Sequence, residues 1–317
     1  MTSPKSSRWH GLILVDKPKG ITSHDVVAGI RRLAGQKRVG HTGTLDPMAT
    51  GLLVVLLGAA ARLEPYLTRL DKTYSGVIEL GRKTDTDDST GRTLYLYDGF
   101  CPDEGRLLSA FEAMKGEIEQ TPPDYSAVKV GGQRAYKAAR AGRPLTLKPR
   151  LVTVYRLALT AYRPPFAEFA ADVSAGCYIR SLARDLGVGL GLGGACLTAL
   201  RRESVGPWPV SKAVSLETLS RGSEDDWRRA LMSPAEALPH LPGVVLDEDQ
   251  RRDFISGRRV AAQPVLLAGR VVSGPYKVQN PEGDLLGIGE FFSPSSLGGD
   301  KPWGPFLRPL RVFPYGS

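Results

Sequence analysis

The chain has 317 residues, of which 42% are hydrophobic. That length allows about two domains and that composition allows a sizeable core, so a disordered chain is excluded. Lysine and arginine outnumber aspartate and glutamate by 42 to 33, for a formal net charge of +9. This balance excludes an acidic, solvating chain and favours an anionic partner, above all a nucleic acid.

Cysteine usage and hydropathy indicate the compartment. Three cysteines without paired spacing, together with only four histidines, predict neither a disulfide framework nor a metal site. The longest apolar run, 52–57, is far shorter than the roughly 20 residues of a transmembrane helix. The polar start of the chain lacks the apolar core of a signal peptide. We therefore expect a soluble, cytoplasmic protein.

Apolar runs and turn residues predict both strands and helices in the first part of the chain. The predicted strands are 11–15, 52–57, 72–80, 125–130, 152–162 and 166–173. The predicted helices are 26–33, capped by Thr22 or Ser23, then 107–114, 179–190 and 197–202. Residues 39–50 and 81–92 are expected to be loops. Because strands and helices do not alternate regularly, we predict an α+β fold with flanking helices on a mainly antiparallel sheet.

The last quarter of the chain differs from the rest in having short strand-like pieces separated by turn residues. Residues 238–243 contain two prolines and are a candidate linker. The short strand-like pieces that follow, 265–272, 276–279 and 285–290, predict a small β-barrel module. The division expected is therefore a first domain at 1–240 and a C-terminal domain at 241–317. Residues 293–304, rich in glycine, serine and proline, are expected to form a loop.

The positive charge is concentrated in one segment. Residues 129–150 hold seven basic residues, beginning with Lys129, and no acidic residue. Arg134, Lys137 and Arg140 recur at helical spacing, which places them along one side of a short helix. A solvated helix face is the alternative for such a run, but solvated faces mix both signs of charge. The absence of acids favours a clamp on a phosphate backbone.

One loop carries a candidate catalytic carboxylate. In residues 40–51 (GHTGTLDPMATG), Asp46 precedes a proline, which restricts its backbone, and the glycines permit close approach of another chain. An Asp-Pro pair in a loop is usually only a turn. A single histidine such as His41 is likewise usually structural, so the loop alone does not establish chemistry.

Several separated motifs occur in one order along the chain. They are 11–23 (GLILVDKPKGITS), 40–51, 72–74 (KTY), 84–87 (TDTD), 120–142 (QTPPDYSAVKVGGQRAYKAARAG), 176–182 (GCYIRSL) and 200–202 (LRR). Together they resemble the bacterial TruB family of tRNA pseudouridine synthases over nearly the full chain. The resemblance implies the pseudouridine synthase fold and a C-terminal RNA-binding domain of the PUA type. It also implies isomerisation of uridine 55, in the T loop of tRNA, to pseudouridine.

The resemblance also implies roles for single residues. Asp46 matches the catalytic aspartate, Arg180 matches its arginine partner, and Tyr74 matches the tyrosine that stacks on the target base. The insertion at about 125–150, with the basic residues named above, matches a segment that folds over the RNA stem-loop. The remaining matches to the base pocket and the substrate loop are Tyr178, Leu200 and His41.

The implied reaction breaks a C1′–N1 bond and forms a C1′–C5 bond without redox or net transfer, so we expect no cofactor. The family implies a monomer that acts on tRNA without an obligatory protein partner. A tRNA-refolding protein with incidental catalysis, or a guide-RNA-dependent relative, would use the same features. Aspartate at position 46 together with Arg180 and Tyr74 favours catalysis, and the string HTGTLDPMAT favours the bacterial form. A DNA-binding module is the weakest alternative, because no helix-turn-helix or finger pattern is present.

Overall fold

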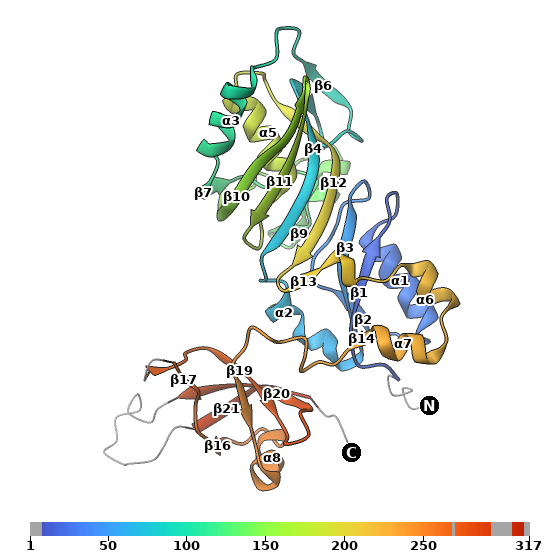
Figure 1. The fold of residues 1–317 in the computed structure, drawn as a ribbon, viewed down its shortest axis with the longest axis vertical. Coiled ribbons are helices and arrows are strands. Elements are labelled where there is room, and N and C mark those ends of the chain that lie inside the picture. Colours follow the sequence, from blue (N-terminus) through green and yellow to red (C-terminus); the bar gives the residue numbers. More distant parts are fainter. Residues whose placement is uncertain (1–7, 268–269, 293–305, 314–317) are drawn as a thin grey trace.

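The computed structural model describes residues 8–267, 270–292 and 306–313 (Figure 1). Within these residues a ten-stranded sheet has the order β14-β1-β3-β12-β4-β11-β10-β7, with β2 paired to β3 and β13 to β12. Its strands are β1 (Gly11–Lys17), β2 (Val39–His41), β3 (Thr50–Leu57), β4 (Lys72–Leu80), β7 (Gly116–Gln120), β10 (Arg150–Arg163), β11 (Phe166–Val173), β12 (Ala195–Val205), β13 (Trp208–Pro209) and β14 (Leu231–Met232). The pairing is antiparallel except between β3 and β12, so the α+β fold with a mainly antiparallel sheet is confirmed.

Helices and 3-10 turns connect and flank these strands. They are α1 (Ser23–Leu33), η1 (Gly58–Leu63), α2 (Glu64–Leu67), α3 (Glu104–Ala113), α4 (Ala135–Arg140), α5 (Ile179–Gly189), η2 (Val210–Lys212), α6 (Leu216–Arg221) and α7 (Glu224–Ala230). Among the helices of the described ranges, none is long and apolar enough to cross a membrane.

The half of the sheet that contains β4, β10, β11 and β12 buries one face under α3 and α5 (Figure 1). Phe169 and Ile78 on the strands pack in one cluster with Phe111 of α3 and Leu182 of α5. The alternating burial of β11 follows from this arrangement, because every second side chain points away from the helices. The loop that carries Asp46 adds Leu45 and Met48 to the same cluster.

Strands β1 and β3 are covered on both faces. Ile13 and Val55 pack against α1, whereas Leu14 and Leu56 pack against η1 on the opposite face. A strand that is buried on both faces reads as a continuous apolar run, which explains the sequences GLILV and LLVVLL. The site loop leads directly into β3, so it starts from a rigid, fully buried strand.

A second sheet of five strands follows, in the order β15-β19-β20-β21-β16. Its elements are β15 (Gly243–Val245), α8 (Glu248–Ile255), β16 (Val260–Ala261), β19 (Pro275–Gln279), β20 (Leu285–Phe292) and β21 (Phe306–Val312). Leu285, Ile288 and Phe313 pack in one cluster with residues of β1 and β3. Leu238, inside the expected linker, is fully buried in that cluster. The segment is therefore anchored in the core at its first residue, whereas Pro239, His240 and Gly243 are exposed.

The structure corrects several predicted elements. Residues 197–202 form part of β12 and not a helix, because they pair with both β4 and β3 in the middle of the sheet. Short apolar runs do not distinguish a helix from a buried strand, and tertiary pairing overrides the helical preference of alanine and leucine. Residues 39–41, expected in a loop, pair with β3 as β2.

The remaining corrections concern short hairpins. Of the strand expected at 125–130, only β8 (Lys129–Val130) forms, paired with β9 (Gln133–Arg134). The loop expected at 81–92 contains β5 (Arg82–Thr84), paired with β6 (Thr93–Leu96). The piece expected at 265–272 is the strand pair β17 (Leu266–Leu267) and β18 (Arg270–Val271). The loop expected at 293–304 lies outside the described residues.

Candidate active site

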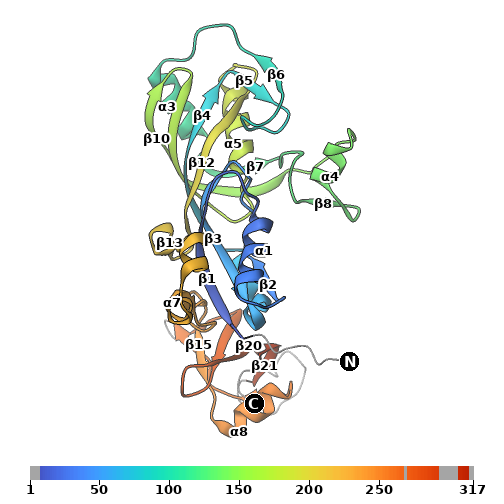
Figure 2. The same cartoon turned by 90° about the vertical axis from the view of Figure 1, so that its right-hand side faces the viewer.

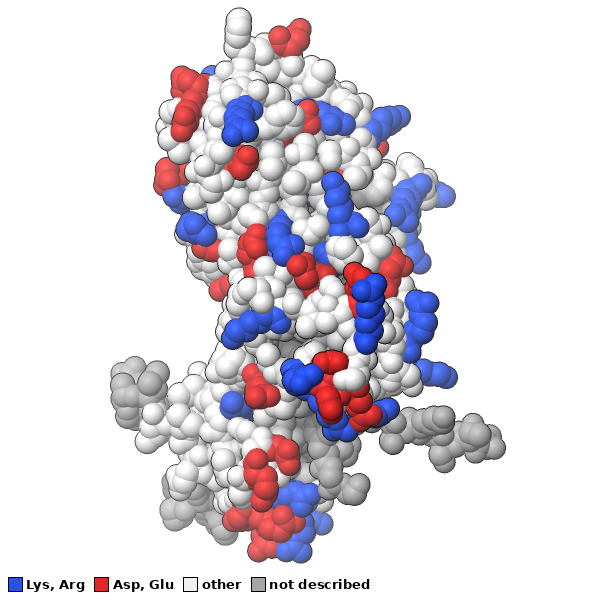
Figure 3. Space-filling model, turned by 45° about the vertical axis from the view of Figure 1, so that its right-hand side comes forward, with Lys and Arg blue, Asp and Glu red and all other residues white. Residues whose placement is uncertain are grey.

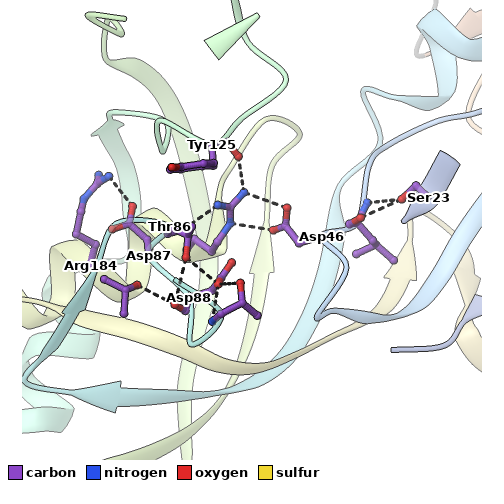
Figure 4. A network of polar contacts seen from close by, with 11 residues as sticks. Ser23, Asp46, Thr86, Asp87, Asp88, Tyr125 and Arg184 are labelled. Atoms are coloured by element: carbon purple, nitrogen blue, oxygen red, sulfur yellow. Dashed lines mark hydrogen bonds and ion pairs between the residues drawn. The ribbon is translucent and has the colours of Figure 1, made fainter. Parts of the chain in front are cut away.

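Asp46 and Arg180 form a two-point ion pair where the 40–51 loop meets the start of α5 (Figure 4). Arg180 Nε lies 2.8 Å from Asp46 Oδ2, and Arg180 Nη2 donates to Asp46 Oδ1 at 3.0 Å. A bidentate pair of this kind fixes both the position and the plane of the carboxylate. The structure thus brings together the predicted acid and arginine, which are 134 residues apart in the sequence.

Two backbone carbonyl groups complete the environment of Arg180. Its Nη1 donates to the Thr86 carbonyl oxygen and its Nη2 to the Tyr125 carbonyl oxygen, both at 2.9 Å. The Arg180 side chain is only 6% exposed, whereas that of Asp46 is 31% exposed. The arginine is therefore a buried support, and the carboxylate is the member of the pair that a substrate can reach.

Burial raises the pKa of Asp46 above the ordinary range of an aspartate. Arg180 acts in the opposite direction, by its charge and by its hydrogen bond, and Lys17 also favours the ionised form. The neighbouring Asp88 adds a smaller upward effect on the pKa of Asp46. The carboxylate is thus a desolvated base whose ionised form depends on its arginine partner.

The loop that supplies the Thr86 carbonyl is itself braced. Asp88 Oδ1 accepts hydrogen bonds from Thr86 Oγ1 and from the Thr90 backbone N–H, both at 2.9 Å. Asp87, in the left-handed region at φ 58°, pairs with Arg184 of α5 at 3.1 Å. Burial raises the pKa of Asp87 to about 6, although Arg184 acts against this. These contacts hold the loop, and hence one acceptor of Arg180, against α5.

Tyr74 and Leu200 lie on one face of neighbouring strands. Tyr74 of β4 is opposite Arg202 of β12, and Gly76 is opposite Leu200, so side chains two positions apart share a face. Tyr74 and Leu200 are both 8% exposed and belong to the cluster that contains Leu45, next to Asp46. Both residues therefore belong to the core cluster to which the 40–51 loop contributes Leu45 and Met48.

Tyr178 connects the site with the insertion. It precedes α5, and its N–H donates to Gln120 Oε1 at 2.7 Å while its carbonyl oxygen accepts from Gln120 Nε2 at 3.2 Å. Its side chain packs against a small cluster made by Val128, Ala135 and Leu147 of the insertion. The insertion therefore contacts a residue that lies two positions before Arg180 in the chain.

The insertion projects from the body of the molecule as β8, β9 and α4 (Figure 2). Ala135 and Ala138 face inward, whereas the predicted basic residues are exposed. These residues are Lys129, Arg134, Lys137 and Arg140. Among the ion pairs of the described chain, none joins these four side chains to an acid. Figure 3 shows basic side chains along the right-hand edge of the molecule, and a mixture of both signs over the C-terminal sheet.

His41 lies half-buried at the start of the 40–51 loop. Its Nδ1 accepts a hydrogen bond from the Gly43 backbone N–H at 3.2 Å, so the proton of the neutral ring is on Nε2. Burial lowers the pKa of His41, and the nearby charge of Arg202 lowers it further. His41 is therefore a neutral donor through Nε2 at the entrance to the loop.

Two buried cations that support the loop were not predicted. Lys17 donates to the carbonyl oxygens of Pro18 at 2.9 Å, Ile21 at 2.8 Å and, in the loop itself, Pro47 at 3.5 Å, and burial lowers its pKa to about 8. Arg202 donates to the carbonyl oxygens of Leu52 at 2.6 Å and Gly43 at 3.1 Å. Their acceptors are backbone atoms, which leave no pattern in the sequence.

The comparisons with known proteins agree with this geometry. The model of the TruB family pseudouridylate synthase (N terminal domain) matches residues 31–179. The tRNA pseudouridine synthase B of Thermobifida fusca is 45% identical over 295 residues, which cover 90% of this chain and 96% of that protein. The enzyme of the same name from Arthrobacter sp. is 45% identical over 258 residues, which cover 80% of this chain and 82% of that protein.

Solved structures extend the likeness to the fold. The chain in the crystal structure of a Cbf5-Nop10-Gar1 complex superposes with a TM-score of 0.73 at 27% identity, covering 98% of this chain and 91% of that one. The fold and the relatives are those of a pseudouridine synthase, an isomerase. Within that class, the chain belongs to the TruB family. In the described residues, no group of three or more histidine, cysteine or acidic side chains is arranged to hold a metal ion.

Proposed function

We propose that this enzyme isomerises uridine 55 in the T loop of tRNA to pseudouridine. The observation that carries the proposal is the bidentate Asp46–Arg180 pair, with its partly open carboxylate and its buried guanidinium. The relatives named above carry tRNA in their names. The exposed basic insertion is the surface that an RNA backbone would bind.

In this reaction the base must leave its stack before the carboxylate can reach it. Extrusion of a nucleotide costs a few kcal/mol. Stacking on an aromatic ring returns about 1–3 kcal/mol per base. We assign this role to Tyr74, which lies in the same core cluster as Leu45, the residue before Asp46. Leu200 and Tyr178 would enclose the extruded base, and His41 would donate to the substrate loop through Nε2.

Asp46 would then act as an ionised carboxylate, either attacking the nucleoside or removing a proton from the ribose. The C1′–N1 bond breaks, the uracil turns, and the C1′–C5 bond forms. The C5 hydrogen is finally released to solvent as a proton, and N1 of the turned base takes up a proton, so that the reaction is a net isomerisation. Arg180 keeps Asp46 ionised and oriented through these steps.

The position of modification tests the proposal. The purified chain would be incubated alone with an unmodified tRNA transcript, and pseudouridine would be mapped by carbodiimide labelling and reverse transcription. We expect one strong stop at the T-loop uridine, and none in a matched transcript with cytidine at that position. Modification at other uridines, or modification only after a guide RNA is added, would contradict the proposal.

The raised pKa of Asp46 predicts the acid limb of the pH profile. Because the ionised carboxylate is the active form, the rate falls as the pH is lowered through the pKa of Asp46. Since burial raises that pKa, we expect the fall to begin at a higher pH than for an exposed aspartate. Single-turnover rates measured across the pH range check this, with circular dichroism to confirm that the enzyme stays folded.

Neutralising the insertion should weaken RNA binding and reduce its salt dependence. In the triple variant Arg134→Gln, Lys137→Gln and Arg140→Gln, the slope of log K against log salt should decrease by up to about one unit for each phosphate group that the protein no longer neutralises. Titrations of tRNA at several salt concentrations measure this slope.

A matched triple variant separates local contacts from net charge. Arg221, Arg228 and Arg229 of α6 and α7 are exposed and pair with acids on their own helices. Changing these three to glutamine removes the same charge, and we expect a smaller change in slope. Equal slopes for the two triple variants would mean that the basic residues of the insertion do not contact phosphate groups and form only a solvated helix face.

The remaining features of the proposal concern organisation. We propose that residues 1–240 are the catalytic domain and that residues 241–317, which contain the second sheet, are a PUA-type RNA-binding domain. We also propose that the enzyme works in the cytoplasm as a monomer, without an obligatory protein partner. Sedimentation of the chain alone and with tRNA tests the monomer.

A further inference from the structure

Two neighbouring hydroxyl groups at the start of α1 have different partners. Thr22 is the N-cap: its Oγ1 accepts from the Asp25 backbone N–H at 3.1 Å, and the Asp25 carboxylate accepts from the Thr22 N–H at 2.8 Å. This capping box satisfies the helix end by itself. The hydroxyl group of Ser23 is therefore not needed by the helix.

Ser23 reaches the catalytic loop instead (Figure 4). Its Oγ accepts a hydrogen bond from the Leu45 backbone N–H at 2.8 Å and donates to the Leu45 carbonyl oxygen at 3.0 Å. Ser23 is 2% exposed and Leu45 is 3% exposed, so water does not compete for these bonds. One side chain thus satisfies both backbone polar groups of the residue that immediately precedes Asp46.

This contact bears on catalysis because the bidentate geometry tolerates little displacement. The Leu45 carbonyl belongs to the peptide group whose N–H is that of Asp46, so fixing it fixes the start of the Asp46 backbone. The Leu45 side chain is anchored in the core cluster that also contains Tyr74. Without Ser23, the backbone N–H and carbonyl group of Leu45 would be buried without these partners, and the loop would move to find others.

We propose that Ser23 is a positioning residue. It holds the Leu45–Asp46 peptide group in the position from which the Asp46 carboxylate contacts both Arg180 and the substrate. The proposal rests on the proposed catalytic role of Asp46. It also assigns the two hydroxyl groups of Thr22–Ser23 separate tasks, one in capping α1 and one in orienting the catalytic loop.

Thr22→Ala is the matched control for Ser23→Ala, because each removes one hydroxyl group from the same helix start. Rates would be measured in single-turnover reactions with saturating tRNA transcript, well below the Tm of both variants. We expect Ser23→Ala to lower the rate constant by about 10- to 100-fold, as small displacements of reacting groups do. Its affinity for tRNA should stay within about two-fold of the wild type, since phosphate contacts dominate affinity. Thr22→Ala should lower the Tm but keep the rate constant within about two-fold of the wild type, since its bonds stay within α1.

Amide hydrogen exchange provides a readout that does not depend on activity. Exchange at Leu45 and Asp46 should be faster in Ser23→Ala than in Thr22→Ala, because only the first variant frees the loop. Equal protection in both variants, equal rate constants, or a loss of rate that Thr22→Ala shares would overturn the positioning role. A wild type that modifies no tRNA would contradict the proposed function, and the exchange comparison would still decide the role of Ser23.

Discussion

Asp46→Asn should abolish pseudouridine formation while leaving tRNA binding nearly intact. The substitution keeps the size of the side chain and one oxygen acceptor for Arg180, but removes the charge and the basicity that the reaction uses. We expect the single-turnover rate to fall by at least about 10³-fold, the effect of removing a group that acts in the chemical step. Product formation in single-turnover reactions and filter binding of the same transcript measure the two quantities.

A second aspartate–arginine pair provides the control for this variant. Asp16 accepts from Arg201 at 3.1 and 2.8 Å, in a two-point contact that does not include Asp46. Asp16→Asn removes the same charge from a second, more exposed bidentate pair, and we expect its rate to stay within a few-fold of the wild type. Strong residual turnover in Asp46→Asn, or an equal loss in Asp16→Asn, would remove Asp46 as the catalyst.

Arg180→Lys should give the second-largest loss. Lysine keeps the positive charge, but it lacks the planar fork that bonds both carboxylate oxygens and two carbonyl groups at once. A hydrogen bond to a charged group contributes about 1.5–3 kcal/mol, so we expect the rate to fall by about 10- to 100-fold. Rates and thermal unfolding of this variant would be measured beside those of Arg201→Lys, the same change in the control pair.

The pH profile of the rate distinguishes two roles of Arg180, namely support of the fold and ionisation of Asp46. Because its charge and its hydrogen bond both lower the pKa of Asp46, Arg180→Gln should raise that pKa further and move the acid limb of the rate to higher pH. The Arg201→Gln profile should keep the wild-type limb. An unmoved limb in Arg180→Gln would mean that the arginine serves the fold and not the ionisation of Asp46.

Much of the fold was predictable because local patterns agree with the tertiary structure. The alternation of 72–80 and of 166–173 reflects one buried face of a strand, and the continuous run 52–57 reflects burial on both faces. The error at 197–202 arose because alanine, leucine and arginine favour helices, whereas the pairing with β3 and β4 that decides the strand is non-local.

The site was predictable only in part. Asp46 and Arg180 were identified by resemblance, and the structure brings them into contact, but no spacing rule relates residues so far apart. Lys17, Arg202 and Ser23 donate hydrogen bonds to backbone carbonyl groups of the 40–51 loop. Since any residue supplies a backbone carbonyl group, the sequence carries no sign of such partners. Ser23 was expected only as one of two helix caps.

The release of tritium from an unmodified tRNA transcript labelled at C5 of uridine tests the central claim most directly, because only bond formation at C5 expels that hydrogen. The chain would be assayed alone, with the substrate in excess over the enzyme. We expect more product than enzyme from the wild type, with the modified position mapping to uridine 55 in the same transcript, and no release above background from Asp46→Asn. Tight tRNA binding without tritium release by the wild type would contradict the proposed activity and would favour a tRNA-refolding protein or a guide-dependent enzyme.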